Sequence, residues 1–566
     1  MRYLPLLEWI KTYNRAHLAA DLLAALIVTL MLIPQSFAYA LLAGLPPETG
    51  LYATVLPLLA YMVFGTSRTL SVGPVAVASL MTAAAVHEVV PEGGAAASEA
   101  AIALALLSGA MLLVLGLLRF GLIANLLSHP VVAGFITASG ILIALSQLGA
   151  LLGITAGGNN LLVLLSALFG NFSHIQPETA LIGISSVLLL IFIRKKLSSL
   201  LVKVGLSPHA AAMLSKIGPI VVVVLATFVV WFLQWDQHGV ALIGHIPQGL
   251  PTLHWPQSHW FFSPELIQAA FLIGLIGYVE SVSVGKTLGA KRRQRIDPDQ
   301  ELIGLGAANL ASGLSGGFPV TGGFARSVVN FDAGAQTPAA SGFAAVGVAV
   351  MALAFSSWLS FLPKAVLAAT IIVAVSALVD FSILKKSWHY AKTDFIAVLG
   401  TIVVTLLQGV ELGVLSGVLA SIALHIFKTS RPHIAEVGLI EGTEHFRNIK
   451  RYRVLTHPSI VSLRVDESLY FANATFLENK IYSLVATRKD LKHVVLMCSA
   501  INEIDMSALE ALEAINERLH EQGICFHLSE VKGPVMDALK RSDFLTHLNG
   551  QIFLTQFQAI ETIKNK

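Results

Sequence analysis

Long apolar runs fill the chain up to about residue 430, and polar positions within them are few. A helix that crosses a bilayer needs about 20 apolar residues, and fewer where neighbouring helices shorten it. We therefore predict fourteen membrane segments, although those near residues 74, 300 and 324 are too short to be assigned alone. The segments lie at 22–40, 51–64, 74–87, 100–118, 131–152, 179–193, 216–234, 266–285, 300–315, 324–333, 338–360, 364–379, 394–408 and 411–428.

Beyond about residue 450 the pattern changes to short apolar runs and an amphipathic helix pattern. The runs 460–465, 493–497 and 524–528 predict strands, and 507–520 has apolar residues at helical spacing. Strands that alternate with helices indicate a small α/β domain. We expect a lead-in at 1–20, a membrane part at 21–430, a linker at 431–449 and the α/β domain at 450–566.

The composition separates the same two parts. Hydrophobic residues make up 55% of the 566 residues and charged residues only 13%, with a mean hydropathy of +0.73. About a quarter of the residues after 430 are charged, against about a tenth before it, whereas soluble domains carry about 25%. This excludes a purely soluble enzyme, a disulfide-rich secreted protein and a disordered chain. The net charge of +3 gives no reason to expect nucleic acid as a partner, and Cys498 and Cys525 alone make no disulfide framework.

Basic residues predict the orientation of the membrane segments, because Lys and Arg concentrate in cytoplasmic loops. With an even number of spans, their distribution places both termini and the α/β domain on the cytoplasmic side of the inner cell membrane. Residues 1–21 have no small-residue cleavage site, so we expect an interfacial lead-in rather than a cleaved signal peptide. Basic residues cluster in the connections at 194–216, 286–295 and 385–392, and none lies in 88–99, 153–178 or 235–265.

Two short segments follow glycine and proline, at 69–79 (TLSVGPVAVAS) and 316–327 (GGFPVTGGFARS). Irregular backbone at membrane depth is tolerated only where protein or a water-filled cavity surrounds it, and such paired segments mark binding sites in transporters. They are the third and tenth segments, as an inverted repeat of about 21–235 and 265–430 requires. Their positive N-terminal ends would face each other and could bind an anion. The alternative is two ordinary kinked helices.

Two charged residues lie inside predicted spans: Glu280, well within the eighth, and Arg326, one turn into the tenth. Charges at such depth are rare and mark functional sites. Burial favours the protonated form of a carboxylate, and a nearby arginine favours the ionised form. A Glu280 that gains and loses contact with Arg326 could therefore bind and release a proton. The alternative is a structural Glu–Arg pair that closes the core.

Several motifs resemble those of the sulfate permease (SulP) family. In the first half they are 33–43 (IPQSFAYALLA), 46–52 (PPETGLY) and 65–74 (GTSRTLSVGP), and in the second 280–286 (ESVSVGK) and 317–327 (GFPVTGGFARS). The resemblance covers essentially the whole chain. It implies a polytopic α-helical, uracil-permease-like fold of fourteen segments in a 7+7 inverted repeat, with a core domain (spans 1–4 and 8–11) and a gate domain (spans 5–7 and 12–14). It also implies a homodimer and a carboxy-terminal STAS domain.

The resemblance further implies an anion site between the ends of spans 3 and 10, lined by span 1. Gln35 and Tyr39 lie four residues apart and share a helix face, while simple helix packing is the alternative role for Tyr39 and Phe37. In this chain the site would consist of Gln35, Phe37, Tyr39, Ser71, Gly73, Val75, Ala76, Thr321, Gly322, Gly323, Phe324, Ala325 and Arg326, with Glu280 as the proton-coupling residue.

Two positions depart from branches of the family. A sodium-coupled bicarbonate branch has an Asp followed one turn later by a Thr on span 8, where this chain has Glu280 and Val284. Valine offers no oxygen ligand to Na⁺, and the segment is more similar to plant and fungal sulfate transporters, whose equivalent Glu is linked to proton coupling. Ala325 stands where some exchangers place a Ser before the Arg, which leaves anion binding to Arg326 and the backbone N–H groups.

In the α/β domain, residues 505–509 (DMSAL) are similar to the STAS loop that carries a phosphorylatable Ser in bacterial anti-sigma-factor antagonists. Ser507 falls on that position and is a candidate regulatory phosphosite. Asp and Ser are also favoured at helix N-termini, so helix capping is the alternative. A cytoplasmic partner of this domain is a further expectation.

We therefore predict a secondary active anion transporter that takes up sulfate with protons, by an elevator-type movement of core against gate. The alternatives are a symporter or exchanger of bicarbonate, chloride or a dicarboxylate, and a membrane-anchored regulatory protein without transport, since similar scaffolds differ in substrate. The sequence has no catalytic constellation, cofactor motif or metal-ligand spacing, so we expect neither an enzyme nor a bound cofactor or metal. The expected partners are the anion, protons, the lipid bilayer and a second copy of the chain.

Overall fold

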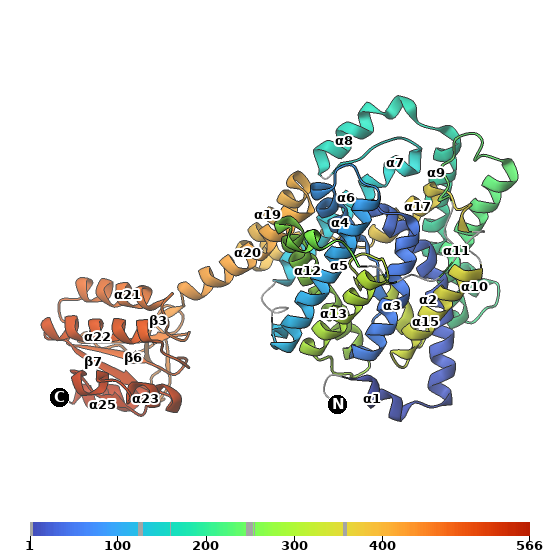
Figure 1. The fold of residues 1–566 in the computed structure, drawn as a ribbon. Helices are drawn as coiled ribbons and strands as arrows, with labels where there is room; N and C mark the ends of the chain where they lie inside the picture. The colour runs from blue at the N-terminus through green and yellow to red at the C-terminus, as the bar shows by residue number, and fades with distance from the viewer. Residues whose placement is uncertain are drawn as a thin grey trace. The chain divides into compact units, whose positions relative to one another are not determined.

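The computed structural model describes residues 4–122, 128–158, 160–244, 249, 253, 255–354 and 359–565. The chain divides into two compact units, Met1–Ser421 and Ile422–Lys566. The first unit is a helical bundle, and the second is a sheet with helices on its faces (Figure 1). Parts of several predictions lie outside the described residues: 1–3 of the lead-in, 123–127 of the membrane part, 355–358 of the segment 338–360 and 566 of the α/β domain. The same holds for 159, 245–248, 250–252 and 254 in the connections without basic residues.

Helices occupy the positions of all fourteen predicted segments, so the helical character of these segments is confirmed. Their bounds are α2 (Arg15–Leu42), α3 (Pro47–Phe64), α4 (Ala76–Val89), α5 (Ala95–Leu117), α6 (His129–Ser146) with α7 (Leu148–Leu152), α9 (Pro177–Phe192), α11 (Pro208–Leu233), α12 (Pro264–Lys291), α13 (Pro298–Leu314), α14 (Phe324–Asp332), α15 (Ala339–Ala354), α17 (Lys364–Val375), α19 (Lys392–Gln408) and α20 (Val410–Ser430).

Shorter helical elements connect these segments. They are α1 (Leu6–Trp9), α8 (Leu161–Gly170), α10 (Ser198–Lys203) and α18 (Ser382–Tyr390), with the 3-10 turns η1 (Ile10–Thr12), η3 (Phe172–His174) and η5 (Ser258–Phe262) and the π-helical turn η4 (Ile193–Leu197).

The bundle has the lengths and the surface that a bilayer requires. Among the described residues, α2, α5, α12 and the continuous stretch His129–Leu152 are each long and apolar enough to cross a membrane, and shorter apolar helices accompany them. Large apolar side chains point outward, such as Leu26, Phe169 and Phe232, which are 59%, 75% and 67% exposed. A surface in water rarely exposes so many such side chains, so these outer faces fit contact with lipid.

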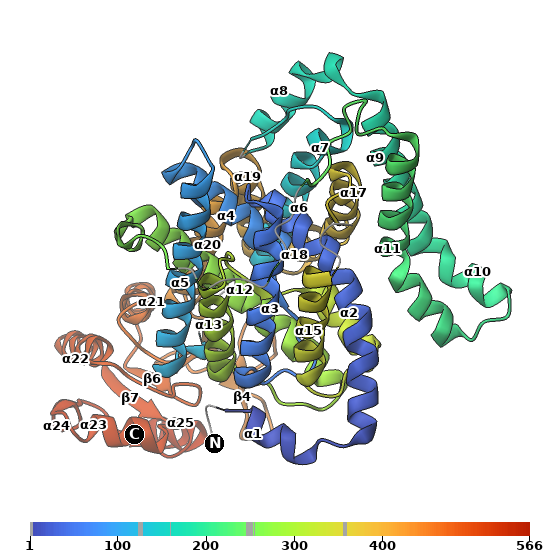
Figure 2. The same ribbon diagram turned by 45° about the vertical axis from the view of Figure 1, so that its right-hand side comes forward.

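The helices of the bundle pack in two groups. Helices α2–α5 and α12–α15 form one group, and Figure 2 shows α5, α13, α3, α15 and α2 of this group side by side. Helices α6, α7, α9, α11, α17 and α19 form the other. Glycines allow the closest approaches, as small residues do between membrane helices. A Cβ at Gly109 of α5 would lie 2.7 Å from the backbone N of Leu310, and one at Gly306 of α13 would lie 2.8 Å from that of Leu113.

Two very short strands join the halves of the bundle. β1 (Val72–Gly73) pairs with β2 (Thr321–Gly322) in antiparallel register, with Val72 opposite Gly322 and Gly73 opposite Thr321. Each strand leads directly into a short helix, β1 into α4 and β2 into α14. These are the two interrupted segments of the sequence, so the prediction of two half-helices that begin within the bundle agrees with the structure.

The second unit is a six-stranded sheet in the order β4-β3-β5-β6-β7-β8. Strands β5 to β8 run parallel, and β3 is antiparallel to both β4 and β5. Helices α21 and α22 cover one face, and α25 covers the other. The bounds are β3 (Ile434–Leu439), β4 (Phe446–Asn448), β5 (Ile460–Val465), β6 (His493–Met497), β7 (Cys525–Ser529), β8 (Ile552–Phe553), α21 (Ala474–Thr487), α22 (Met506–Glu521), α23 (Gly533–Leu539), α24 (Phe544–His547) and α25 (Gln556–Lys564).

The predicted linker at 431–449 was wrong, because β3 and β4 lie within it and extend the sheet. Glu436 and Gly438 interrupt the apolar pattern of β3, so this run gives little strand signal by itself. The segment is a strand because it pairs with β5, with Ile434 opposite Val465 and Glu436 opposite Leu463.

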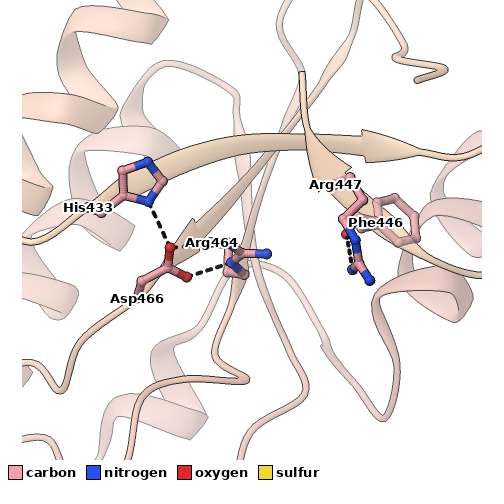
Figure 3. A network of polar contacts seen from close by, with 5 residues as sticks. All are labelled: His433, Phe446, Arg447, Arg464 and Asp466. Carbon is pink, nitrogen blue, oxygen red and sulfur yellow. Dashed lines mark hydrogen bonds and ion pairs between the residues drawn. The ribbon is translucent and has the colours of Figure 1, made fainter. Parts of the chain in front are cut away.

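A polar network ties the start of β3 to the end of β5 (Figure 3). Asp466 accepts hydrogen bonds from Nδ1 of His433 at 2.7 Å and from Nε of Arg464 at 2.5 Å, and its backbone N donates to the carbonyl of His433 at 3.1 Å. Partial burial opposes ionisation of Asp466, but these two partners outweigh it and hold the pKa of the carboxyl below its usual range. The network therefore secures the strand that follows the last membrane helix.

Candidate functional site

The first turns of α4 and α14 leave backbone N–H groups without partners inside their helices. The first helical bonds run from Ser79 N to Val75 O (2.9 Å) and from Ser327 N to Gly323 O (3.0 Å). Val75 and Gly323 are in extended conformation, and neither provides a side-chain cap. The first N–H groups of a helix have no intrahelical acceptor. Both helices therefore present donors and a positive dipole end beside the β1–β2 pair.

A buried guanidinium lies beside this pair of strands. Arg326 is 2% exposed, and neither Nη1 nor Nη2 has a hydrogen-bond partner. A Cβ at Gly73 would lie 3.1 Å from Nη1, and one at Gly323 would lie 3.0 Å from both Nε and Nη2. The two glycines, Gly73 in β1 and Gly323 just before α14, therefore make room for the guanidinium against the backbone. A buried charge without a partner is costly, so the arrangement is suited to an anion that supplies one.

Glu280 and Tyr39 are the ionisable groups that interact electrostatically with Arg326. Glu280 is partly buried on α12, and Tyr39 is 8% exposed on α2. Neither is hydrogen bonded to the guanidinium, and among the described residues Glu280 and Arg326 form no ion pair. A closed structural Glu–Arg pair, the alternative raised by the sequence, is thus absent from the described geometry.

Some of the other predicted residues lie at the β1–β2 pair, and others line two nearby cavities or pack in the core. Gln35 and Ala325 line a cavity of about 420 Å³, and Phe324, 48% exposed, lines a second cavity of about 410 Å³ together with Glu280. Phe37 is fully buried in the core, which agrees with the packing role. The remaining predicted residues Ser71, Val75, Ala76, Thr321 and Gly322 are buried at or beside the two strands.

Small polar side chains that the sequence analysis did not select hold the strands in place. Ser281 Oγ accepts from Gly322 N at 2.8 Å, and Asn309 bonds both the N and the O of Val320 at 2.9 and 2.8 Å. Ser327 Oγ accepts from Ser71 N at 3.0 Å and links the two half-helix segments. The sequence could have indicated these residues, because each is a polar residue within an otherwise apolar helical segment.

Glu301 is a second carboxylate that the sequence analysis did not select. It is fully buried on α13 and accepts four hydrogen bonds: from Tyr61 Oη (2.7 Å), Thr66 N (2.8 Å), Thr66 Oγ1 (2.5 Å) and Ser67 N (3.1 Å). It thereby holds the connection between α3 and β1. A carboxylate inside an apolar segment was the available signal, as it was for Glu280.

In the second unit, Ser507 is exposed at the second residue of α22, and Asp505 Oδ1 accepts from Ala508 N at 2.8 Å. The capping role of Asp505 is therefore present in the structure, and Ser507 remains accessible for modification.

His493, Cys525 and His527 bring possible ligand atoms within 4.8 Å of one another. Gln551 N donates to Nδ1 of His527 at 3.0 Å, which places the proton of a neutral ring on Nε2, where it donates to Nδ1 of His493. In this tautomer of His527, Nδ1 already accepts a hydrogen bond and Nε2 carries the proton. Neither ring nitrogen then has a free lone pair for a metal ion, so the arrangement does not fit a metal site.

The chain matches the model of the sulfate permease family over residues 18–401 and that of the STAS domain over residues 451–559. The chloroplastic sulfate transporter 4.1 of Arabidopsis thaliana is 33% identical over 565 residues, which cover 98% of this chain and 81% of the relative. High affinity sulfate transporter 2 of Stylosanthes hamata is 30% identical over 581 residues, with 99% and 86% covered.

Two solved structures share the fold. The murine solute carrier 26 family member A9 anion transporter, in the inward-facing state, has a TM-score of 0.90 at 23% identity and covers 100% of this chain and 94% of its own. The transmembrane domain of a cyanobacterial bicarbonate transporter, BicA, has a TM-score of 0.60 at 22% identity and covers 72% of this chain and 98% of its own. The fold of this chain is therefore one that solved structures already show.

Proposed function

The chain belongs to the sulfate permease family, and we propose that it is a secondary active transporter that carries sulfate into the cell together with protons. The relatives that share about a third of its sequence over nearly its whole length are named as sulfate transporters. We further propose that it works as a homodimer in the inner cell membrane with both termini in the cytoplasm.

The observation that carries the proposal is the unpartnered guanidinium of Arg326 between two helix N-termini. Sulfate would supply the missing partner to Nη1 and Nη2, and its other oxygens would accept from the free N–H groups of α4 and α14. Guanidinium and oxyanion bind through parallel charge-assisted hydrogen bonds, and helix N-termini stabilise anions further. The extended backbone at Gly323 and the absence of side chains at both glycines keep this space open.

The position of Glu280 supports the proposed coupling to protons. The carboxylate lies within electrostatic reach of the same guanidinium that would bind the anion. When a dianion occupies Arg326, the guanidinium stabilises ionised Glu280 less, so binding of anion and proton would be cooperative. Val284, one turn further along α12, provides no oxygen to a sodium ion.

For the movement, we propose that α2–α5 and α12–α15 slide as one body past the remaining helices. The β1–β2 pair and the close α5–α13 packing join these helices firmly. Both cavities described above lie where this group meets the other group, with walls from α6, α9, α11 and α17. A displacement at this boundary would expose the site alternately to the two sides of the membrane.

Radiolabelled sulfate uptake into proteoliposomes tests the proposal, with an imposed proton gradient and then with a sodium gradient. We expect uptake with the proton gradient alone, and Glu280→Gln should abolish this acceleration while sulfate–sulfate exchange at equal pH persists. Acceleration by protons in Glu280→Gln would contradict the coupling role. Flux of bicarbonate, chloride or a dicarboxylate in place of sulfate would change the substrate, and no anion flux at all would indicate a regulatory protein.

A further inference from the structure

Two cavities flank the first turn of α14, and they are of similar size. The Gln35 cavity, about 420 Å³, reaches from Gln35 and Ala325 past Thr370 and Ala374 to Arg194. The Glu280 cavity, about 410 Å³, reaches from Glu280 and Phe324 past Ala133 to His129, Lys286 and Asp380. Phe324 and Ala325 are neighbours in the chain, so the first turn of α14 separates the two spaces.

Both cavities extend from the site toward the same side of the bundle. The Gln35 cavity ends near the C-terminal end of α9, and the Glu280 cavity near the N-terminal end of α6 and the C-terminal end of α12. In the alternating order of the predicted spans, these ends lie on the cytoplasmic side. The site thus has two connections toward that side rather than one.

The two cavities differ in charge. Arg194 lines the Gln35 cavity, and no carboxylate of the described residues lines it. Two carboxylates, Glu280 and Asp380, line the Glu280 cavity, together with Lys286 and His129. Lys286 offsets one of the two carboxylates, so the formal charge of the lining is positive in the first cavity and negative in the second. The net charge of a cleft with low-dielectric walls attracts ions of the opposite sign, so a sulfate dianion is favoured in the first cavity and disfavoured in the second.

One hydrogen bond orients the exposed side chain of Arg194. It lies in the π-helical turn η4 that continues α9, and its Nη1 donates to the carbonyl of Val373 on α17 at 2.9 Å. Among the described residues, no further hydrogen bond of its guanidinium is recorded. Gly218 of α11 accommodates the wide turn, because a Cβ there would overlap with Ile193. Single π turns of this kind often occur at functional sites.

We propose that the anion and the proton use separate paths to the cytoplasmic side: the anion passes Arg194 through the Gln35 cavity, and the proton passes His129 and Asp380 through the Glu280 cavity. Arg194 is then a second, transient binding position for the anion. The inference rests on the proposed function for the identity of the ions, but the division by charge is a property of the two cavities themselves. Arg326 and Tyr39 are the ionisable groups that interact with Glu280, and Lys286, Asp380 and His129 line the same cavity.

Thiol modification measures this division without any transport. Ala374→Cys places a thiol in the Gln35 cavity, and Ala133→Cys places one in the Glu280 cavity. Both are introduced into purified full-length protein with Cys498→Ala and Cys525→Ser, and each is treated with methanethiosulfonates that carry either a sulfonate or a trimethylammonium group. We expect the anionic-to-cationic rate ratio to be at least tenfold higher at residue 374 than at residue 133.

Arg194→Gln should remove most of the anionic preference at residue 374, whereas Lys195→Gln, which removes the same charge from the neighbouring residue outside the cavity, should leave it unchanged. Equal rate ratios at the two thiols would overturn the proposal. Absence of reaction at either thiol would overturn it as well, since that path would then be closed to ions.

Transport measurements test which ion uses which cavity. Arg194→Gln should raise the half-saturating sulfate concentration about tenfold and leave the pH dependence of uptake unchanged, with Lys195→Gln as the matched control. Asp380→Asn should change the pH dependence and keep the half-saturating concentration within about twofold. If one variant changes both properties, the paths are not separate. If wild-type protein moves no sulfate while the thiols still discriminate by charge, the proposed function fails and the division of the cavities stands.

Discussion

The guanidinium of Arg326 lies directly against the Cα of Gly73, so that a Cβ at residue 73 would be 3.1 Å from Nη1. These residues belong to different halves of the chain, and the pairing of β1 with β2 brings them together. The backbone of the first half therefore positions the buried charge of the second half, and both halves contribute to one site.

Gly73→Ala tests this relationship. The added methyl group would displace the guanidinium by a few tenths of an ångström, and the φ of +158° at Gly73 would strain a residue with a side chain. We expect the half-saturating sulfate concentration to rise about tenfold, or about 1.4 kcal/mol. Gly400→Ala on α19 is the control, because a Cβ there meets nothing within 4 Å. Uptake kinetics in proteoliposomes would measure both variants. An unchanged concentration in Gly73→Ala would show that the contact does not position Arg326.

Arg326 should tolerate neither loss of charge nor loss of shape. Lysine keeps the charge but offers a single nitrogen in place of a planar fork, so Arg326→Lys should weaken sulfate binding about tenfold. Arg326→Gln, without charge, should weaken it by at least about 100-fold. Arg68→Gln, an exposed arginine before β1, is the control. Equal affinity in Arg326→Gln and wild type would assign anion binding to the helix ends alone.

Glu301 should matter for stability before it matters for transport. Glu301→Ala leaves several buried donors without an acceptor, and each costs about 1–3 kcal/mol. We expect the melting temperature of the detergent-solubilised protein to fall by at least about 5 °C. Tyr61→Phe removes one of the four bonds and should cost much less. A normal melting temperature in Glu301→Ala would mean that the connection between α3 and β1 does not depend on this carboxylate.

Cys498 should be unreactive in the folded protein. Burial, aided by the charge of Glu530, raises the pKa of its thiol to about 12 from a usual value of 9.0. Because the folded state favours the neutral thiol, this contribution to stability is complete below about pH 9 and declines as the pH rises toward 12. Iodoacetamide reacts with thiolates, so mass spectrometry after treatment at pH 8 should find Cys498 unmodified in native protein and modified in urea.

The local pattern of residues determined the elements. Apolar runs placed helices at all fourteen expected segments, and Gly–Pro stretches before residues 76 and 324 marked where the two half-helices begin, because these residues act on the backbone of their own neighbourhood. The family motifs and the α/β character of the second unit were also readable, as were Glu280 and Arg326 as charges inside apolar segments.

Only the tertiary structure decided which of these residues meet. Gly73 packs against Arg326, Glu301 accepts from the connection that leads into β1, and β3 joins the sheet inside the segment expected to be a linker. Hydrophobicity and helix propensity act over a few residues, whereas these contacts join positions that lie far apart along the chain. They depend on how helices and strands pack in three dimensions, and that packing produces an unpartnered charge at the centre of the bundle.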